Sequence, residues 1–400
     1  MTTRAPSFAG TCLLIAWLAP VAASATGAPA AGASAESAGQ PALSPAETQI
    51  RAAQERIAAR RADSHAYLSL AAGLTRRARE TGDGSYYDRA LEALAEARRV
   101  DPESVEAART LAWVRMGRHE FARARTIARR FAAAHPDDDW NLGTLGDAAM
   151  ELGRYDEAEE AFQRMVDLRP GPAAYTRAAY LRETRGDLTG ALELMQMSLQ
   201  ATGAQDPEDR AWLLVQIGHL HEVMGEPALA ESSHRPALAA FPRYHYALAA
   251  LAELALAAGR ALEAVDLATE AIATAPHAER YLVLADALRA AGRETEAHDA
   301  EDRFETAALA DTWKANENHD LVLFYLDRRP DPPRALEIAR REARMRRDVQ
   351  TLDRLACARL RTGDVAAARR LMRRILKVGT RDPLILRHAQ EMEARGRPPL

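Results

Sequence analysis

The side chains best suited to chemistry in this sequence belong to the segment His219-Leu220-His221-Glu222. Histidine and carboxylate groups are common zinc ligands. However, residues two apart on a helix point to different faces, so His219 and His221 cannot easily share one ion. His245 begins the next segment and gives a weaker alternative, in which it lies near His221. We favour packing or surface roles for these histidines, and we predict no metal site and no cofactor.

No catalytic signature accompanies them. The sequence contains no Gly-rich phosphate loop, no CxxC, no HExxH and no GxSxG pattern. Paired carboxylates such as Glu159 and Glu160 fit a solvated helix face. Cys357 lies in an apolar helical run, which indicates a small core residue more than a nucleophile. We therefore predict a protein that is not an enzyme and has no catalytic residues; an enzyme or metalloprotein is the less favoured alternative.

The segment Ala211 to Pro242 shows which elements must position these groups. It contains two apolar helical patterns separated by Gly225, and Pro242 cannot continue a helix interior. Such a helix–turn–helix of about 34 residues cannot bury its apolar face alone. Glycines recur at intervals close to this period. The predicted turn glycines are Gly117, Gly153, Gly186, Gly225, Gly259 and Gly292.

Three of these units carry a detailed pattern of large, small and aromatic residues. The third has Leu142, Leu145, Gly146, Gly153, Tyr155, Ala158, Phe162 and Pro170. The fifth has Leu214, Ile217, Gly218, Gly225, Ala230 and Pro242. The sixth has Leu248, Leu251, Ala252, Gly259, Ala264, Ala271 and Pro276. This pattern resembles the tetratricopeptide repeat (TPR) family, and the whole chain looks like its bacterial exported members.

The resemblance implies an all-α fold, a right-handed α-solenoid of about nine repeats. A composition rich in Ala, Leu, Arg and Glu, with 6% aromatic residues, is also typical of helices. We expect the solenoid over residues 44–400, with a first helix at 44–62, repeats at 64–383 and a C-terminal cap at 384–394. Pro236 should bend or break a second helix. The second helix of the seventh repeat should run past Phe304.

The chain begins with a pattern typical of export. Arg4 precedes the apolar run Cys12 to Ala19, and small residues around Ala23 to Ala25 resemble a cleavage site. We predict a signal peptide at 1–25 and a flexible Ala/Gly/Ser/Pro linker at 26–43. The mature protein would be periplasmic or extracellular, without a transmembrane segment.

Charge is distributed unevenly along the chain. Residues 328–400 contain 20 Arg and Lys against 9 Asp and Glu, whereas the whole chain has a net charge of −4. A basic end can bind anionic polymer or lipid, so an envelope tethering protein is the alternative function. Aromatic residues that could stack bases are sparse in this region, and we expect no nucleic-acid partner.

The favoured function is a protein–protein interaction scaffold of the bacterial cell envelope. The TPR resemblance implies that certain first-helix residues face a concave groove, which would bind a peptide or protein segment. These residues are Trp140, Asp147, Tyr180, Glu183, Trp212, His219, Glu222, Tyr246, Glu253 and Asp286. Aromatics with carboxylates favour an extended segment that carries Arg or Lys beside apolar residues. Packing of Trp140, Trp212 and Tyr246 between repeats is the alternative role for the aromatics.

Overall fold

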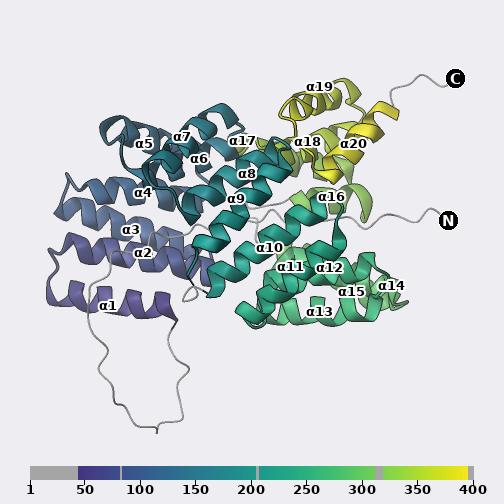
Figure 1. The fold of residues 1–400 in the computed structure, drawn as a ribbon, viewed down its shortest axis with the longest axis horizontal. Helices are drawn as coiled ribbons and strands as arrows, with labels where there is room; N and C mark the ends of the chain where they lie inside the picture. The colour runs from purple at the N-terminus through teal and green to yellow at the C-terminus, as the bar shows by residue number, and fades with distance from the viewer. Residues whose placement is uncertain (1–43, 82, 204–206, 311–318, 395–400) are drawn as a thin grey trace, which may run out of the picture. The chain divides into compact units, whose positions relative to one another are not determined.

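The fold comes from a computed structural model that describes residues 44–81, 83–203, 207–310 and 319–394. The predicted signal peptide and linker lie outside the described residues. Throughout the described ranges the regular structure is α-helical (Figure 1). No helix in these ranges combines the length and the apolar character that a membrane span needs.

Twenty helices follow one another in the described residues. They are α1 Pro45–Ala59, α2 Ser64–Thr81, α3 Ser85–Val100, α4 Val105–Gly117, α5 Phe121–Ala134, α6 Asp139–Glu151, α7 Tyr155–Leu168, α8 Pro172–Thr184, α9 Leu188–Ala201, α10 Pro207–Val223, α11 Pro227–Ala240, α12 His245–Ala257, α13 Ala261–Thr274, α14 Ala278–Ala290, α15 Glu294–Ala310, α16 His319–Asp327, α17 Pro332–Met345, α18 Val349–Arg361, α19 Val365–Leu376 and α20 Pro383–Ala394.

Local sequence signals begin and end these helices. Ser44 and Glu47 form a capping box before α1, in which each side chain accepts the other residue's backbone N–H. The side chains of Asp331, Asp348 and Asp364 cap α17, α18 and α19 in a similar way. These bonds satisfy backbone donors that have no partner within the helix.

Helices α2 to α19 form nine helix–turn–helix pairs, with α1 leading them and α20 following them. Each helix packs mainly on its neighbours in the chain, and first helices of successive repeats also pack together, as α10 does with α12 and α12 with α14. The predicted all-α solenoid of about nine repeats is therefore confirmed. Helix α15 runs to Ala310, past Phe304 as expected.

The described chain divides into two compact units, and the boundary falls within α6. The first unit ends at Leu145 and the second begins at Gly146.

The turn of the second repeat does not use Gly117 as expected. Gly117 ends α4, and His119 takes the left-handed conformation with φ 57°. Glu120 N–H then donates to Arg115 O, as Arg154 N–H donates to Ala149 O one repeat later. The equivalent position in that repeat is Gly153, 34 residues after His119. Gly117 is instead required by packing, because a Cβ there would collide with the ring of Tyr87.

Small residues inside first helices receive large residues from their partner helices. A Cβ at Gly146 would collide with the ring of Phe162, and one at Gly218 with the ring of His234. His234 is fully buried and therefore fills the place of the usual aromatic residue. Helix α11 continues through Pro236, so the expected break is wrong.

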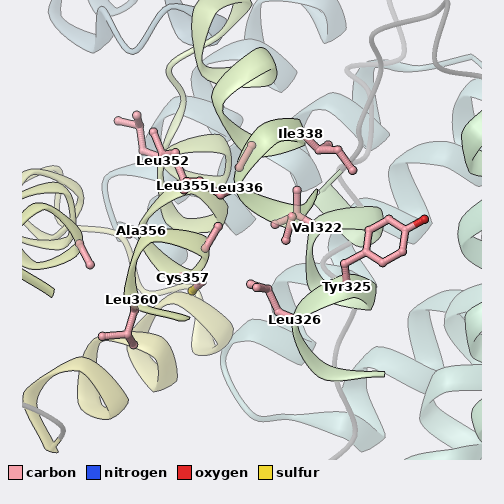
Figure 2. Close-up of a cluster of buried hydrophobic side chains, with 14 of the residues drawn as sticks. Val322, Tyr325, Leu326, Leu336, Ile338, Leu352, Leu355, Ala356, Cys357 and Leu360 are labelled. Atoms are coloured by element: carbon pink, nitrogen blue, oxygen red, sulfur yellow. The ribbon is translucent and has the colours of Figure 1, made fainter. Parts of the chain in front are cut away.

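The second unit has its largest apolar core around α16, α17 and α18. Figure 2 shows Val322 and Leu326 of α16 close to Leu336 of α17 and Leu355 of α18. Cys357 belongs to this core and is 7% exposed, which agrees with its predicted role.

Within this unit the C-terminal repeats contact the turns of the third and fourth repeats. Arg347 N–H donates to Glu151 O at 2.7 Å, and Val349 N–H donates to Tyr155 Oη at 3.0 Å. The backbone of Gly379 lies against the turn at Arg185 and Gly186. These contacts join segments that are almost 200 residues apart in the sequence, because 194 positions separate Tyr155 from Val349.

Candidate binding surface

The ten predicted groove residues lie on five first helices, α6, α8, α10, α12 and α14. Trp140 lies in the part of α6 that belongs to the first unit. Trp140 is half-buried there. Its ring contacts Trp113 edge-on at 6.0 Å, and the Arg109 guanidinium lies 5.0 Å from it. The remaining nine residues belong to the second unit.

Three of these nine have packing or ion-pair roles inside the fold. Asp147 is completely buried and accepts hydrogen bonds from Arg177 Nε at 2.9 and 3.1 Å. Burial raises the pKa of Asp147 to about 6, although the Arg177 charge opposes that rise. Trp212 is 5% exposed in an apolar cluster with Leu213, and Tyr180 packs at the edge of the cluster around Phe162.

Glu183 and Glu222 each have a histidine partner. His219 Nε2 lies 2.9 Å from Glu183, and His234 Nε2 lies 2.6 Å from Glu222. Burial lowers the pKa of His219, but the Glu183 charge and hydrogen bond outweigh it and raise that pKa to about 9. His219 is therefore a cation at neutral pH. His221 bonds to Glu226 instead, so the two neighbouring histidines do serve different faces.

Asp286 and Tyr246 each interact with an arginine of this chain. The Arg328 guanidinium lies 2.6 Å from Asp286 and also pairs with Glu301 at 3.1 Å. The Arg280 guanidinium lies 5.6 Å from the centre of the Tyr246 ring. A cation from the same chain thus already lies beside each of these two residues.

Glu253 differs from the other carboxylates of this set. It is half-buried on α12, and no group in the described residues forms a hydrogen bond or an ion pair with it. Burial raises its pKa well above the usual value, and the negative charges of Glu222, Asp320 and Asp286 raise it further. These four acids lie on α10, α12, α14 and α16, the first helices of four consecutive repeats.

Asp320 belongs to this acidic surface, although sequence reasoning did not select it. Burial raises its pKa to about 6, the largest effect, and Glu279 raises it further, while Arg354 and Arg328 act against the rise. Asp320 comes directly before the apolar run of α16, so a first-helix register would have revealed it. The irregular turn of that repeat obscured the register.

A second cluster that the sequence did not reveal joins α18 and α20. His388 Nδ1 lies 2.8 Å from Asp353 Oδ2, and Cys357 Sγ lies 3.9 Å from Asp353 Oδ1. Their residue types and spacing could hold a metal ion. However, Arg354 also pairs with Asp353, and burial raises the pKa of the Cys357 thiol well above normal. The cluster therefore acts here as a hydrogen-bond network that fixes α20 on α18.

The fold and the repeat spacing define an α-solenoid of helix–turn–helix repeats. The profile of the tetratricopeptide repeat family matches residues 75–139 and 144–209. The predicted resemblance to the tetratricopeptide repeat family is confirmed over these residues. A search of curated protein sequences gave no match.

Solved structures of repeat proteins share this fold at low sequence identity. The human IFIT1 dimer with PPP-AAAA is 18% identical, with a TM-score of 0.52 over 79% of this chain and 73% of that one. The APC/C hetero-tetramer Cut9–Hcn1 is 17% identical, with a TM-score of 0.50 over 77% of this chain. The match spans 59% of the length of that relative. At this identity the likeness concerns the fold alone. TPR folds are typically non-catalytic scaffolds with protein partners.

Proposed function

We propose that this protein is an interaction scaffold of the bacterial cell envelope, and that the acidic surface of its second unit binds an extended cationic segment of a partner. The acidic surface is defined by Glu222, Glu253, Asp286 and Asp320. The observation that carries the proposal is Glu253. It lacks a cation from this chain among the described residues, yet it lies among like charges.

Such an arrangement is unfavourable in the free protein, because each carboxylate disfavours ionisation of the next. A bound Arg or Lys would relieve the repulsion and favour ionised Glu253. Binding should therefore release a proton and become tighter as the pH rises. Electrostatic complementarity of this kind selects the partner and speeds association more than it adds affinity.

The test uses a fluorescein-labelled peptide of alternating arginine and leucine, with anisotropy as the readout. Glu253→Gln should weaken binding about tenfold at low salt, a loss of about 1.4 kcal/mol. The matched control is Asp266→Asn, which removes an exposed carboxylate from α13 of the same repeat. It should leave the affinity nearly unchanged.

Measuring the free energy of unfolding distinguishes a binding role for Glu253 from a structural role. Its folded pKa lies above its unfolded value, so ionisation costs stability as the pH rises above about 4.5. Glu253→Gln should therefore raise the free energy of unfolding at pH 7 while it weakens peptide binding. Unchanged affinity with a folded variant would exclude the acidic surface as the contact.

Only part of the basic charge in residues 328–400 is available for the alternative function, tethering to an anionic polymer or lipid. Several of its basic residues pair inside the fold, as Arg328 does with Asp286 and Arg361 with Asp327. Deletion of the region would also remove most of the largest core of the second unit. The basic charge that is left for an external anion includes Arg340 and Arg344 of α17 and the exposed face of α19.

A further inference from the structure

Helix α19 presents a row of cations to solvent. Four exposed residues recur at helical spacing, namely Arg370, Arg373 and Arg374 on the helix and Lys377, its C-cap residue. The other face of the helix is buried through Ala368, Met372 and Ile375. The apolar face of this amphipathic helix is therefore already used by the core, and only its cationic face is free.

The cationic face of α19 pairs directly with no acid of the described residues, although the Arg370 charge, after the Ala367 N–H and Arg359, helps to lower the pKa of Asp364. None of its four residues forms an ion pair or a side-chain hydrogen bond with another described residue. Of the acids that flank the row in sequence, Asp364 pairs with Arg359 at 2.6 Å, and Asp382 accepts the Leu384 N–H at 2.8 Å. Glu391 and Glu393 on α20 are exposed, and no cation of the described residues lies within ion-pair distance of them. Repulsion within the row would be relieved by an anionic ligand.

An exposed apolar side chain accompanies these cations. Leu376 is 37% exposed, next to Lys377 and one helical turn after Arg373. Basic residues that flank an exposed leucine match the interface of an anionic bilayer, where headgroups meet acyl chains. Three of the four cations are arginines, whose planar guanidinium groups bind phosphate with two hydrogen bonds. A duplex nucleic acid would offer nothing to Leu376, and aromatic residues that could stack single-stranded bases are lacking on α19.

We propose that the cationic face of α19, with Leu376, docks the second unit on a membrane surface of anionic phospholipids. The helix lies against the headgroups and does not cross the bilayer, because its apolar face remains in the protein core. The tethering function would then belong to one helix, α19, and to one class of ligand, anionic phospholipids. It is independent of the acidic surface, which lies on first helices, whereas α19 is a second helix.

Co-sedimentation with phosphatidylcholine vesicles, with and without phosphatidylglycerol, tests this assignment. The full chain should bind only the anionic vesicles, and binding should weaken as salt increases. Each cation near an anionic surface contributes about fivefold, so Arg373→Gln with Arg374→Gln should weaken partitioning about 25-fold. Glutamine keeps the helix propensity of arginine.

The matched control is Arg129→Gln with Arg130→Gln, an adjacent exposed pair on α5, the second helix of the second repeat. This variant should bind vesicles as the unmodified protein does, and a circular dichroism spectrum checks that both variants are folded. Three results would overturn the proposal: no binding to anionic vesicles at low salt, equal losses in the two variants, or binding to a duplex oligonucleotide but not to vesicles. Each is separable from the peptide assay, because Glu253→Gln should leave vesicle binding unchanged.

Discussion

The turns of the third and fourth repeats differ from those of the fifth, sixth and seventh in what surrounds the same left-handed glycine. All five glycines have φ between 64° and 81°. Gly225, Gly259 and Gly292 have open space where a Cβ would be, whereas at Gly153 and Gly186 it would collide with a backbone carbonyl oxygen. Those oxygens belong to Arg347 and Gly379. One local motif thus serves as a plain turn in one region and as a contact surface in the other.

A repeat array need not be held together by contacts between neighbouring repeats alone. Repeats usually contact only their neighbours in sequence. Here the backbone contacts at Gly153 and Gly186 add long-range links between the two ends of the second unit. Such links should make the unfolding of this unit more cooperative than that of a simple stack.

The largest expected effect comes from Gly186→Ala. A left-handed alanine costs about 1–2 kcal/mol, and the collision with the Gly379 carbonyl should add about 1–3 kcal/mol of overpacking. Gly259→Ala should cost only about 1–2 kcal/mol, the cost of the left-handed alanine, because a Cβ there meets open space. Urea denaturation of both variants measures the difference. Equal losses would show that the close contact with Gly379 does not stabilise the unit.

An intermediate effect is expected for Tyr155→Phe. The variant removes the acceptor of the Val349 N–H, and an unsatisfied buried donor costs about 1–3 kcal/mol. Tyr281→Phe is the control, since Tyr281 is also partly buried but its hydroxyl forms no hydrogen bond within the described residues. Thermal denaturation should show a lower unfolding midpoint for Tyr155→Phe and an unchanged one for Tyr281→Phe. If Tyr155→Phe matches the unmodified protein, the α6–α7 turn is not fixed by α18.

The smallest expected effect concerns the titration of His219. Asp382, from the segment after α19, contributes to its raised pKa of about 9. Asp382→Asn should keep the helix cap and lower the His219 pKa slightly, as histidine NMR titration would measure. Asp364→Asn, which changes the cap of α19, should leave it unchanged.

The sign of the corresponding pH dependence follows from that pKa. The folded value lies above the ordinary value of 6.5, so the stability from the His219–Glu183 pair is complete below about pH 6.5 and is lost as the pH rises through 9. A His219 pKa that is unaffected by Asp382→Asn would place the C-terminal segment farther from the fourth and fifth repeats.

The helices, their pairing and the repeat period could be predicted from the amino-acid sequence alone. Caps, turn glycines and apolar spacing act over a few residues, so they can be read without knowing the rest of the chain. The same local pattern identified Cys357 as a core residue and placed Glu222, Glu253 and Asp286 on first helices. The local pattern did not predict the turn at His119, because a residue other than glycine in the left-handed conformation cannot be recognised from the sequence.

Which of those groups have partners depends on how the helices pack in the tertiary structure. Arg328 reaches Asp286 across 42 positions, and His219 reaches Glu183 across 36, while Glu253 on the helix between them has no such partner in the described residues. Ion pairing at this range depends on the angles at which successive helices pack, and these angles accumulate from many small contacts. For the same reason the carbonyl contacts at Gly153 and Gly186 could not be predicted from turns that contain a left-handed glycine just as the turn at Gly259 does.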